Sequence, residues 1–192
     1  MKPRLRSKQI KICSLFTLII LLYSSLTFTS KAQSSIDIIP SLKVGDQLPE
    51  DFWKTKHQTY NGQDLTNQDL SEYKGKLLIL DFWATWCGSC ISNLPKLSKL
   101  QLDFTGKMKV ILVNCFNTRD NEKKISDFYV KRNDLLPAPQ LPTVINDRSL
   151  LQMFPHRIIP HYVWIDANGT VAAITNSQYI NAYQIEQLLS VR

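Results

Sequence analysis

The chain has 192 residues, enough for one globular domain with extensions, and its hydrophobic content of 44% is ordinary for such a domain. Its formal net charge of +7 is unevenly distributed, because residues 1–32 contain six basic and no acidic side chains. The remaining residues carry 17 basic and 16 acidic side chains. This near balance argues against a nucleic-acid partner, which would call for a basic surface on the domain itself.

The N-terminal segment has the pattern of a secretory leader. A basic stretch, Lys2–Lys11, precedes an apolar run of 17 residues, Ile12–Phe28, and Ser30-Lys31-Ala32 resembles a small-x-small cleavage site. We expect residues 1–32 to be a signal peptide and residues 33–41 to be a linker. The alternative is an uncleaved membrane anchor, since the apolar run is near the lower length limit for a span. Both interpretations place the domain outside the cytoplasm, where disulfides persist.

The first part of the domain is rich in turns. Residues 44–53 form an entry that ends in aromatic side chains, and residues 54–69 are mostly polar. Asn61-Gly62 inside the polar stretch is a signal for a β-hairpin. We expect Leu70–Tyr73 to form a short helical turn before the next strand begins.

The next segment predicts a buried strand, a tight turn and a helix in direct succession. Lys76–Ala84 is an almost continuous apolar run, which indicates burial on both faces, as in a parallel or mixed sheet covered by helices. Cys87 and Cys90 follow, and an amphipathic segment begins at once. Cys-x-x-Cys between a strand and a helix is typical of a thiol–disulfide redox pair.

Helix geometry supports that chemistry. Residues i and i+3 lie on one face about 5–6 Å apart, within the Cα separation that a disulfide requires. Unpaired N–H groups at a helix N-terminus favour a thiolate, and we expect Cys87 to be the more exposed one. The alternatives are an inert structural disulfide and a zinc site. For zinc, the other cysteines, Cys13 and Cys115, do not supply a second pair at ligand spacing.

The remaining chain alternates between helical and strand patterns. Apolar residues recur with a helical period from Cys90 to Phe104, where Pro95 should bend the helix. The other predicted elements are a strand at Lys107–Phe116, a helix at Asp120–Arg132, a loop at Leu135–Pro142, a short helix at Leu150–Phe154, strands at His161–Asp166 and Val171–Thr175 around an Asn168-Gly169 turn, and a helix at Ala182–Val191. This order predicts a three-layer α/β domain, with a central mixed sheet flanked by helices.

The sequence of residues 82–90, Phe-Trp-Ala-Thr-Trp-Cys-Gly-Ser-Cys, resembles that of thioredoxin-fold proteins. Val44-Gly45-Asp46 with Pro49, the leader, and Ile159-Pro160 before the last hairpin are similar to the TlpA/ResA-like branch of envelope thiol–disulfide oxidoreductases. The resemblance covers residues 42–192 and implies an N-terminal extension to the fold. The long stretch 117–159 would be an insertion before the strand that follows a cis-proline.

Two positions depart from the patterns of these relatives. Ser89 replaces the proline of the usual thioredoxin turn, and Asp81 is an acid where TlpA-like members often carry a neutral residue. By resemblance, Cys87 is the nucleophile, Cys90 resolves the mixed disulfide, and Asp81 lies beneath the pair and exchanges a proton with Cys90. Desolvation inside an apolar strand also predicts a raised pKa for Asp81. The alternative is a strand-end carboxylate that is hydrogen-bonded to the backbone.

The resemblance also implies a substrate surface around the cysteines. Pro160 would be the cis-proline facing the disulfide, and Ile159 would offer backbone groups to an extended substrate. Trp83 and Trp86 are expected to flank the site, although Trp83 could equally be a plain core residue. Together, the residues expected to contact substrate are Trp86, Gly88, Ser89, Ile159 and Pro160.

We expect an extracytoplasmic enzyme that reduces protein disulfides, because no basic residue or histidine lies between the cysteines to favour the thiolate strongly. The resemblance implies protein disulfide substrates such as apocytochrome c, a membrane thiol as electron donor, and neither a cofactor nor a metal. The alternative is a copper metallochaperone similar to the Sco carriers, with His156 and His161 as candidate ligands, although the cysteine spacing is too short. A peroxiredoxin-like peroxidase needs a lone Thr-x-x-Cys nucleophile, which this motif does not provide.

The other candidate residues carry weaker signals. Cys115 ends a predicted strand and is expected to be a buried apolar residue. His57, His156 and His161 are scattered, so surface or loop positions are expected for them. Asn146-Asp147 and the proline-rich loop before it are candidates for shaping a partner surface.

Overall fold

The computed structural model describes residues 39–136 and 140–190. The predicted signal peptide, the alternative membrane anchor and most of the predicted linker lie outside these residues. Within the described part of the chain, no helix combines the length and the apolar character needed to cross a membrane. Ile39–Arg192 forms one compact unit.

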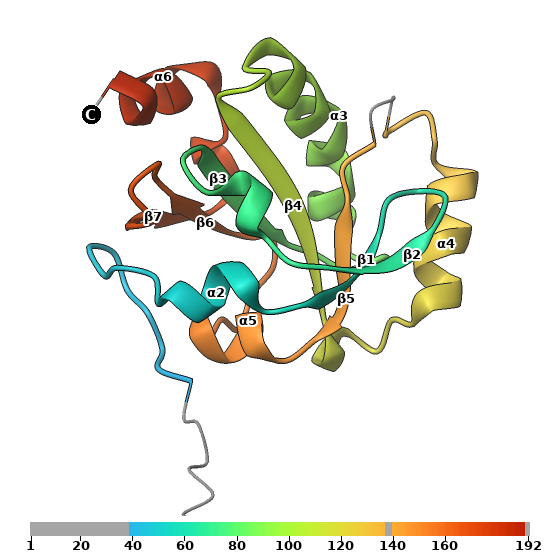
Figure 1. Ribbon diagram of the computed structural model, residues 1–192. Coiled ribbons are helices and arrows are strands. Elements are labelled where there is room, and N and C mark those ends of the chain that lie inside the picture. The colour runs from blue at the N-terminus through green and yellow to red at the C-terminus, as the bar shows by residue number, and fades with distance from the viewer. Residues whose placement is uncertain (1–38, 137–139, 191–192) are drawn as a thin grey trace, which may run out of the picture. The chain divides into compact units, whose positions relative to one another are not determined.

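Seven strands form one mixed sheet in the order β2-β1-β5-β4-β3-β6-β7 (Figure 1). The strands are β1 (His57–Tyr60), β2 (Leu65–Gln68), β3 (Leu77–Phe82), β4 (Met108–Cys115), β5 (Thr143–Asp147), β6 (His161–Ile165) and β7 (Val171–Thr175). β3 pairs in parallel with β4 and antiparallel with β6, and β4 pairs in parallel with β5. All six residues of β3 are buried, as its apolar run predicts.

The helices cover both faces of the sheet. They are α2 (Glu50–Lys54), α3 (Gly88–Asp103), α4 (Glu122–Lys131), α5 (Ser149–Met153) and α6 (Ala182–Ser190). One apolar cluster, here called the α3-side cluster, joins the sheet to α3, α4 and α6, and the α2-side cluster joins its other face to α2 and α5. Because strand side chains alternate, β3 contributes Leu77 and Ile79 to the first and Leu78 and Leu80 to the second. The predicted three-layer α/β architecture is confirmed.

The predicted elements from Leu70 onward are present with ends that differ by a few residues, and the Asn61-Gly62 hairpin joins β1 to β2. The prediction lacks α2 and β5, and also the short 3-10 turns at Phe116–Thr118 and Ser177–Tyr179. The omission of α2 and β5 affects the layers of the fold. Each has five residues, too few for a clear period, and Asn146 of β5 adopts a left-handed backbone with φ 53°. As a result, the stretch predicted as an insertion contributes an inner strand of the sheet. Pro95 lies inside α3, and the bend expected there stays a prediction.

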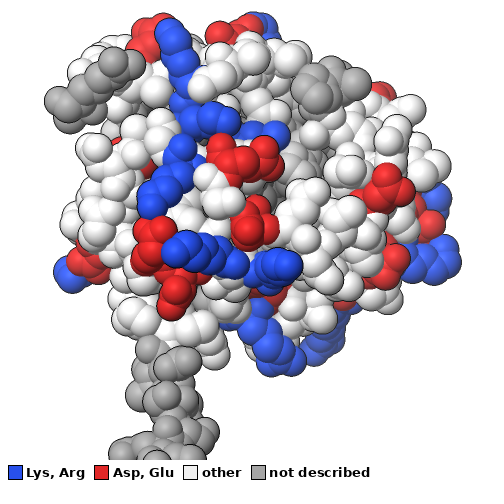
Figure 2. Space-filling model, viewed as in Figure 1, with Lys and Arg blue, Asp and Glu red and all other residues white. Residues whose placement is uncertain are grey.

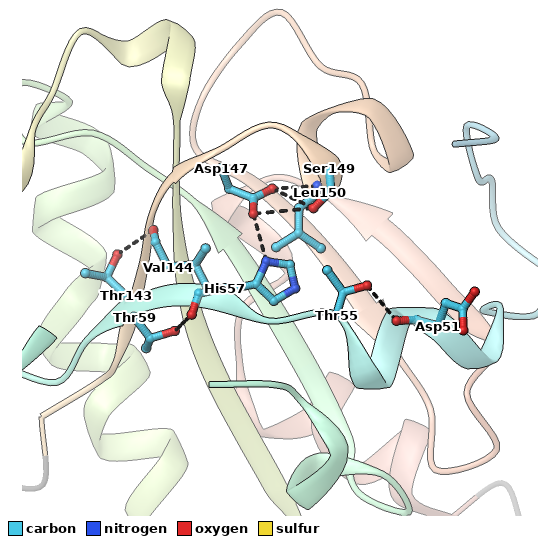
Figure 3. A network of polar contacts seen from close by, with 9 residues as sticks. All are labelled: Asp51, Thr55, His57, Thr59, Thr143, Val144, Asp147, Ser149 and Leu150. Atoms are coloured by element: carbon cyan, nitrogen blue, oxygen red, sulfur yellow. Dashed lines mark hydrogen bonds and ion pairs between the residues drawn. The ribbon is translucent and has the colours of Figure 1, made fainter. Parts of the chain in front are cut away.

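A buried polar network fastens the β1–β2 hairpin to β5 and α5 (Figure 3). His57 Nδ1 lies 2.7 Å from Asp147 Oδ2, and both side chains are buried. Asp147 Oδ1 also accepts a hydrogen bond of 2.6 Å from the Leu150 N–H and one from the Ser149 hydroxyl. The surface or loop position expected for His57 is therefore wrong. Its partner lies 90 residues away along the chain, beyond the reach of local sequence patterns.

The surface charge agrees with the balance found in the sequence. On the face drawn in Figure 2, basic and acidic side chains are interspersed. Exposed ion pairs of the described chain include Lys74 with Glu50 and Lys99 with Asp103. This face therefore presents no field of a single sign that would attract a polyanion.

Candidate active site

The two cysteines lie where β3 gives way to α3, and they are joined by a disulfide with a Cα–Cα distance of 5.3 Å. Cys87 is the N-cap of α3, and Cys90 lies in the first helical turn. Cys87 is 6% exposed and Cys90 is fully buried, so the first cysteine is the more accessible, as predicted. This asymmetry makes Cys87 the better placed of the two to meet an incoming sulfur.

The start of α3 can stabilise a negative charge on Cys87. The backbone N–H of Cys90 points at Cys87 Sγ at a distance of 3.2 Å, and the Ser89 hydroxyl lies 3.6 Å from the same sulfur. The first turn of α3 contains no acidic residue that would oppose a thiolate. A helix N-terminus with free N–H groups lowers the pKa of a cysteine placed there, because it favours the charged form.

Hydrogen bonds to the segment Thr118–Asp120 fix the position of Thr85 and Trp86, which precede the cysteines. Asp120 accepts hydrogen bonds from the Thr85 N–H at 2.8 Å, from the Thr85 hydroxyl at 2.6 Å and from Asn114 Nδ2 at 2.7 Å. The Trp86 indole N–H donates to the Thr118 carbonyl at 2.9 Å, while the side chain remains 63% exposed. The segment before the cysteines thus displays an aromatic surface beside Cys87. Asp120 was missed in the sequence, where nothing links it to Thr85 35 residues earlier.

Asp81 lies in β3, in the interior of the sheet. The disulfide packs against one face of this sheet. The Asp81 side chain is fully buried, and burial raises its pKa well above the usual value, as expected for an acid in an apolar strand. Neither carboxyl oxygen has a hydrogen-bond partner among the described residues, so the alternative of a carboxylate bonded to the backbone is not supported. Alternation along β3 places Asp81 on the same face as Ile79 and Trp83, which share the α3-side cluster with both cysteines.

Tyr162 of β6 lies directly opposite Asp81 in the sheet and belongs to the α3-side cluster. Its hydroxyl is buried and has no hydrogen-bond partner of ordinary geometry, yet the two groups affect each other. Burial is the main cause that raises the pKa of Tyr162, followed by the neighbouring Asp81, and Tyr162 in turn lowers the pKa of Asp81. Tyr162 was missed in the sequence, because its importance depends on strand register.

The Ile159–Pro160 peptide bond is cis, as the resemblance implies. Ile159 is half-buried and packs against the cluster that contains the cysteines, whereas Ile158 before it is 79% exposed. Trp83 is fully buried, and its indole N–H donates to the Thr143 hydroxyl at 2.9 Å, which makes it a core residue. Gly88 and Ser89 are exposed on the first turn of α3.

The histidines do not converge with the cysteines. The rings of His156 and His161 stack with centroids 4.7 Å apart, and both contact Phe82, a member of the α2-side cluster. Burial, followed by the neighbouring His156, lowers the pKa of His161 to about 4. In residues 39–136 and 140–190 no three His, Cys, Asp or Glu side chains are grouped so as to hold a metal ion. The geometry therefore gives no support to the copper-carrier alternative.

Cys115 is the remaining cysteine of the described region, and it is free and buried. Burial raises the pKa of this thiol to about 12, and the nearby Asp147 adds to the shift. A thiol with this pKa stays protonated and unreactive at neutral pH. The expectation of a buried apolar residue is confirmed.

Comparison with curated proteins gives partial matches. Over 87 residues the chain is 34% identical to the thioredoxin-like protein YneN of Bacillus subtilis, which covers 45% of this chain and 47% of that protein. Over 99 residues it is 29% identical to the thiol-disulfide oxidoreductase ResA of Oceanobacillus iheyensis, covering 50% of this chain and 48% of that protein. The chain thus spans about half the length of these curated relatives. They confirm the resemblance to the ResA-like proteins.

Comparison with solved structures supports the fold. The thioredoxin domain of a thiol-disulfide oxidoreductase from Bacteroides vulgatus superposes with a TM-score of 0.59 at 18% identity, covering 77% of this chain and 99% of that one. This confirms the predicted thioredoxin fold. A family model described as Redoxin matches residues 43–189, which include every site residue discussed above, and the chain accordingly belongs to the Redoxin family.

Proposed function

We propose that this protein is an extracytoplasmic thiol–disulfide oxidoreductase that reduces disulfides in other proteins. The observation that carries the proposal is the Cys87–Cys90 disulfide at the N-terminus of α3, in which Cys87 is 6% exposed and Cys90 is fully buried. A relative named as a thiol-disulfide oxidoreductase, with which the chain shares 29% identity, supports the same chemistry.

The reaction proceeds in two exchanges, beginning from the reduced protein. The Cys87 thiolate attacks one sulfur of the substrate disulfide, and the other substrate sulfur leaves as a thiolate. The Cys90 thiolate then attacks Cys87 Sγ, which closes the protein disulfide and releases the second substrate sulfur. The substrate gains the two electrons that the protein dithiol loses, and solvent protons neutralise the released thiolates.

Asp81 serves the second exchange as the proton acceptor. Cys90 is buried, so water reaches its thiol poorly, and its proton needs an internal acceptor. A carboxyl group whose pKa is raised by burial accepts a proton more readily than an exposed one, which suits a general base. When an electron donor reopens the disulfide, the protonated Asp81 returns a proton to Cys90.

The residues proposed to contact the substrate lie around the disulfide. They are Trp86, Gly88, Ser89, Ile159 and Pro160. The exposed Trp86 offers an apolar surface on one side, and the backbone of Ile159 can pair with an extended peptide on the other. Protein disulfides, including those of apocytochrome c, are the proposed substrates, and a membrane thiol protein is the proposed electron donor. The leader pattern supports a location on the extracytoplasmic side of the cell envelope.

Reduction of insulin by the purified protein with dithiothreitol tests the exchange. Cys87→Ser should abolish it, and Cys90→Ser should accumulate a mixed disulfide on Cys87 that mass spectrometry detects. Cys115→Ala is the matched control and should retain the rate, because its thiol is buried and unreactive. Activity that survives Cys87→Ser would refute the assignment of the nucleophile.

Two further measurements test the direction of electron transfer and the cellular location of the protein. Equilibration with glutathione should give a reduction potential below about −200 mV, and a value close to that of the oxidant DsbA, about −120 mV, would contradict a reductase. Expression of the full chain in a bacterial host should yield an exported protein that begins at Gln33. Retention of Met1 on an exported protein would favour the anchor instead.

A further inference from the structure

The sheet contains a pair of buried polar groups that face each other without hydrogen-bonding to anything else described. Asp81 on β3 and Tyr162 on β6 are direct partners in the antiparallel register. Both residues are fully buried, and both carboxyl oxygens of Asp81 and the hydroxyl of Tyr162 lack a hydrogen-bond partner in the described residues. Buried polar groups are nearly always satisfied, so three such atoms at one place in the sheet require an explanation.

In the part of the chain that the structure describes, Tyr162 is the polar side chain paired with Asp81 in the sheet. Across β4, the partner of Asp81 is Leu112, which is apolar. Helix α3 and its N-cap contribute Cys87, Cys90 and aliphatic side chains to the α3-side cluster. Among residues 39–136 and 140–190, Tyr162 is the group that, besides burial, shifts the pKa of Asp81, and no basic side chain of these residues contributes. Apart from the Cys90 thiol, Tyr162 is therefore the hydrogen-bond donor that the described residues offer to an ionised Asp81.

We propose that Tyr162 is a positioning residue for thiol exchange, whose hydroxyl donates a hydrogen bond to the Asp81 carboxylate while that carboxylate takes the proton of Cys90. The inference rests on the proposed function. Before resolution, Asp81 is ionised and holds the Tyr162 hydroxyl as its donor. The Cys90 S–H proton passes to Asp81, the resulting thiolate forms the bond to Cys87, and the bond from Cys87 to the substrate breaks. Once Asp81 is neutral, the hydrogen bond from Tyr162 no longer involves a charged acceptor and is weaker.

The test uses the reaction of the reduced protein with dithionitrobenzoate, which separates the two sulfurs. Release of the first thionitrobenzoate reports attack by Cys87, and release of the second reports attack by Cys90. In Tyr162→Phe, the pH midpoint of the second release should move up by about one to two units, because the carboxylate loses a hydrogen bond to a charged group. At pH values below the wild-type midpoint, the second release should slow about tenfold or more, while the first stays unchanged.

Tyr129→Phe is the matched control. Tyr129 is another buried tyrosine of the α3-side cluster, and its hydroxyl donates to the Leu141 carbonyl at 2.6 Å. Its loss should reduce stability without moving the pH midpoint. If Tyr162→Phe behaves in the same way, with lower stability and an unchanged midpoint, the proposal is overturned and Tyr162 is a packing residue.

A double variant shows whether Tyr162 acts through Asp81. Adding Tyr162→Phe to Asp81→Asn should slow the second release no further than Asp81→Asn alone, and additive losses would refute the proposal. Infrared spectroscopy of the oxidised protein gives a readout that needs no exchange activity. The carboxyl band of Asp81 should disappear at a higher pH in Tyr162→Phe than in the unaltered chain. An unchanged titration overturns the role of Tyr162, whereas a shifted titration in a protein that does not exchange disulfides overturns the proposed function.

Discussion

Two buried aspartates in the same sheet differ in their hydrogen bonding. Asp147, at the end of β5, accepts hydrogen bonds from His57, Ser149 and the Leu150 N–H. Asp81, in the middle of the molecule, accepts none within the described residues. Both side chains are largely withheld from water, so burial alone does not distinguish them.

The difference in hydrogen bonding fits a structural role for Asp147 and the proton-transfer role proposed for Asp81. A carboxylate whose oxygens are all occupied by fixed donors builds structure, and a proton can be added to it only by breaking those bonds. A carboxyl group without partners contributes no such bonds, and burial holds it in a state ready to exchange a proton. The lack of hydrogen-bond partners around Asp81 therefore supports the proton-transfer role proposed for it.

The largest expected effect is on stability at Asp147. Asp147→Leu should lower the free energy of unfolding by about 3 kcal/mol, because it leaves buried donors of His57 and Leu150 without an acceptor. Urea denaturation measures the loss, and the exchange rate per folded molecule should not change. A loss below about 1 kcal/mol would mean that the network in Figure 3 is not structural, and the comparison would break.

The same substitution at Asp81 should have the opposite sign. Asp81→Leu replaces an unsatisfied buried carboxyl group with an apolar one of similar size, which should raise the free energy of unfolding by about 1–2 kcal/mol at pH 8. The same variant should slow disulfide exchange by about 100-fold, because the general base is gone. A destabilised Asp81→Leu with full activity would remove the distinction between the two aspartates.

The pH dependence of stability should also reveal the acid. The folded-state pKa of Asp81 is raised above its usual value of 3.8, so the folded protein binds more protons than the unfolded chain between the two values. Its contribution to stability is full below about pH 4 and is lost as pH rises through the raised pKa, with a slope of up to about 1.4 kcal/mol per pH unit. The free energy of unfolding is measured against pH for both proteins. Subtracting the values of Asp81→Leu from those of the unaltered protein isolates the contribution of Asp81. A difference that stays flat above pH 4 would show that Asp81 ionises normally.

A smaller effect is expected at Asp120, a satisfied acid that lies beside the active site. Asp120→Ala should cost about 1 kcal/mol of stability and slow exchange a few-fold, because Thr85 and the segment leading to Cys87 lose their anchor. Lys99→Ala, which breaks an exposed ion pair with Asp103, is the control and should change stability by less than about 0.5 kcal/mol. Equal effects in the two variants would show that Asp120 is an ordinary surface acid.

The parts of the fold that the sequence predicts well are those with local signals. The apolar run of β3, the Cys87–Cys90 spacing and the periodic apolar residues of α3 each identify their element without any distant contact. Burial of Asp81 follows from the same run. The cis bond before Pro160 follows from family resemblance, since isolated X–Pro bonds are mostly trans.

The parts that the sequence misses depend on contacts between distant segments. β5 is short and contains a left-handed Asn146, so its place in the sheet comes from pairing with β4 and β1. His57 is recognisable as a buried residue only through Asp147, and Tyr162 as a neighbour of the acid only through the register of β3 and β6. In each case the position of the residue or strand depends on a partner that the periodicity of the sequence does not reveal.

The exposure of Trp86 has a practical consequence. The chain contains four tryptophans, and Trp53, Trp83 and Trp164 are at most 3% exposed, whereas Trp86 is 63% exposed. A water-soluble quencher such as iodide should therefore reach one indole only, the one adjacent to Cys87. Protection of that indole from iodide would report binding of a protein substrate at the proposed substrate surface, with no label attached to either molecule.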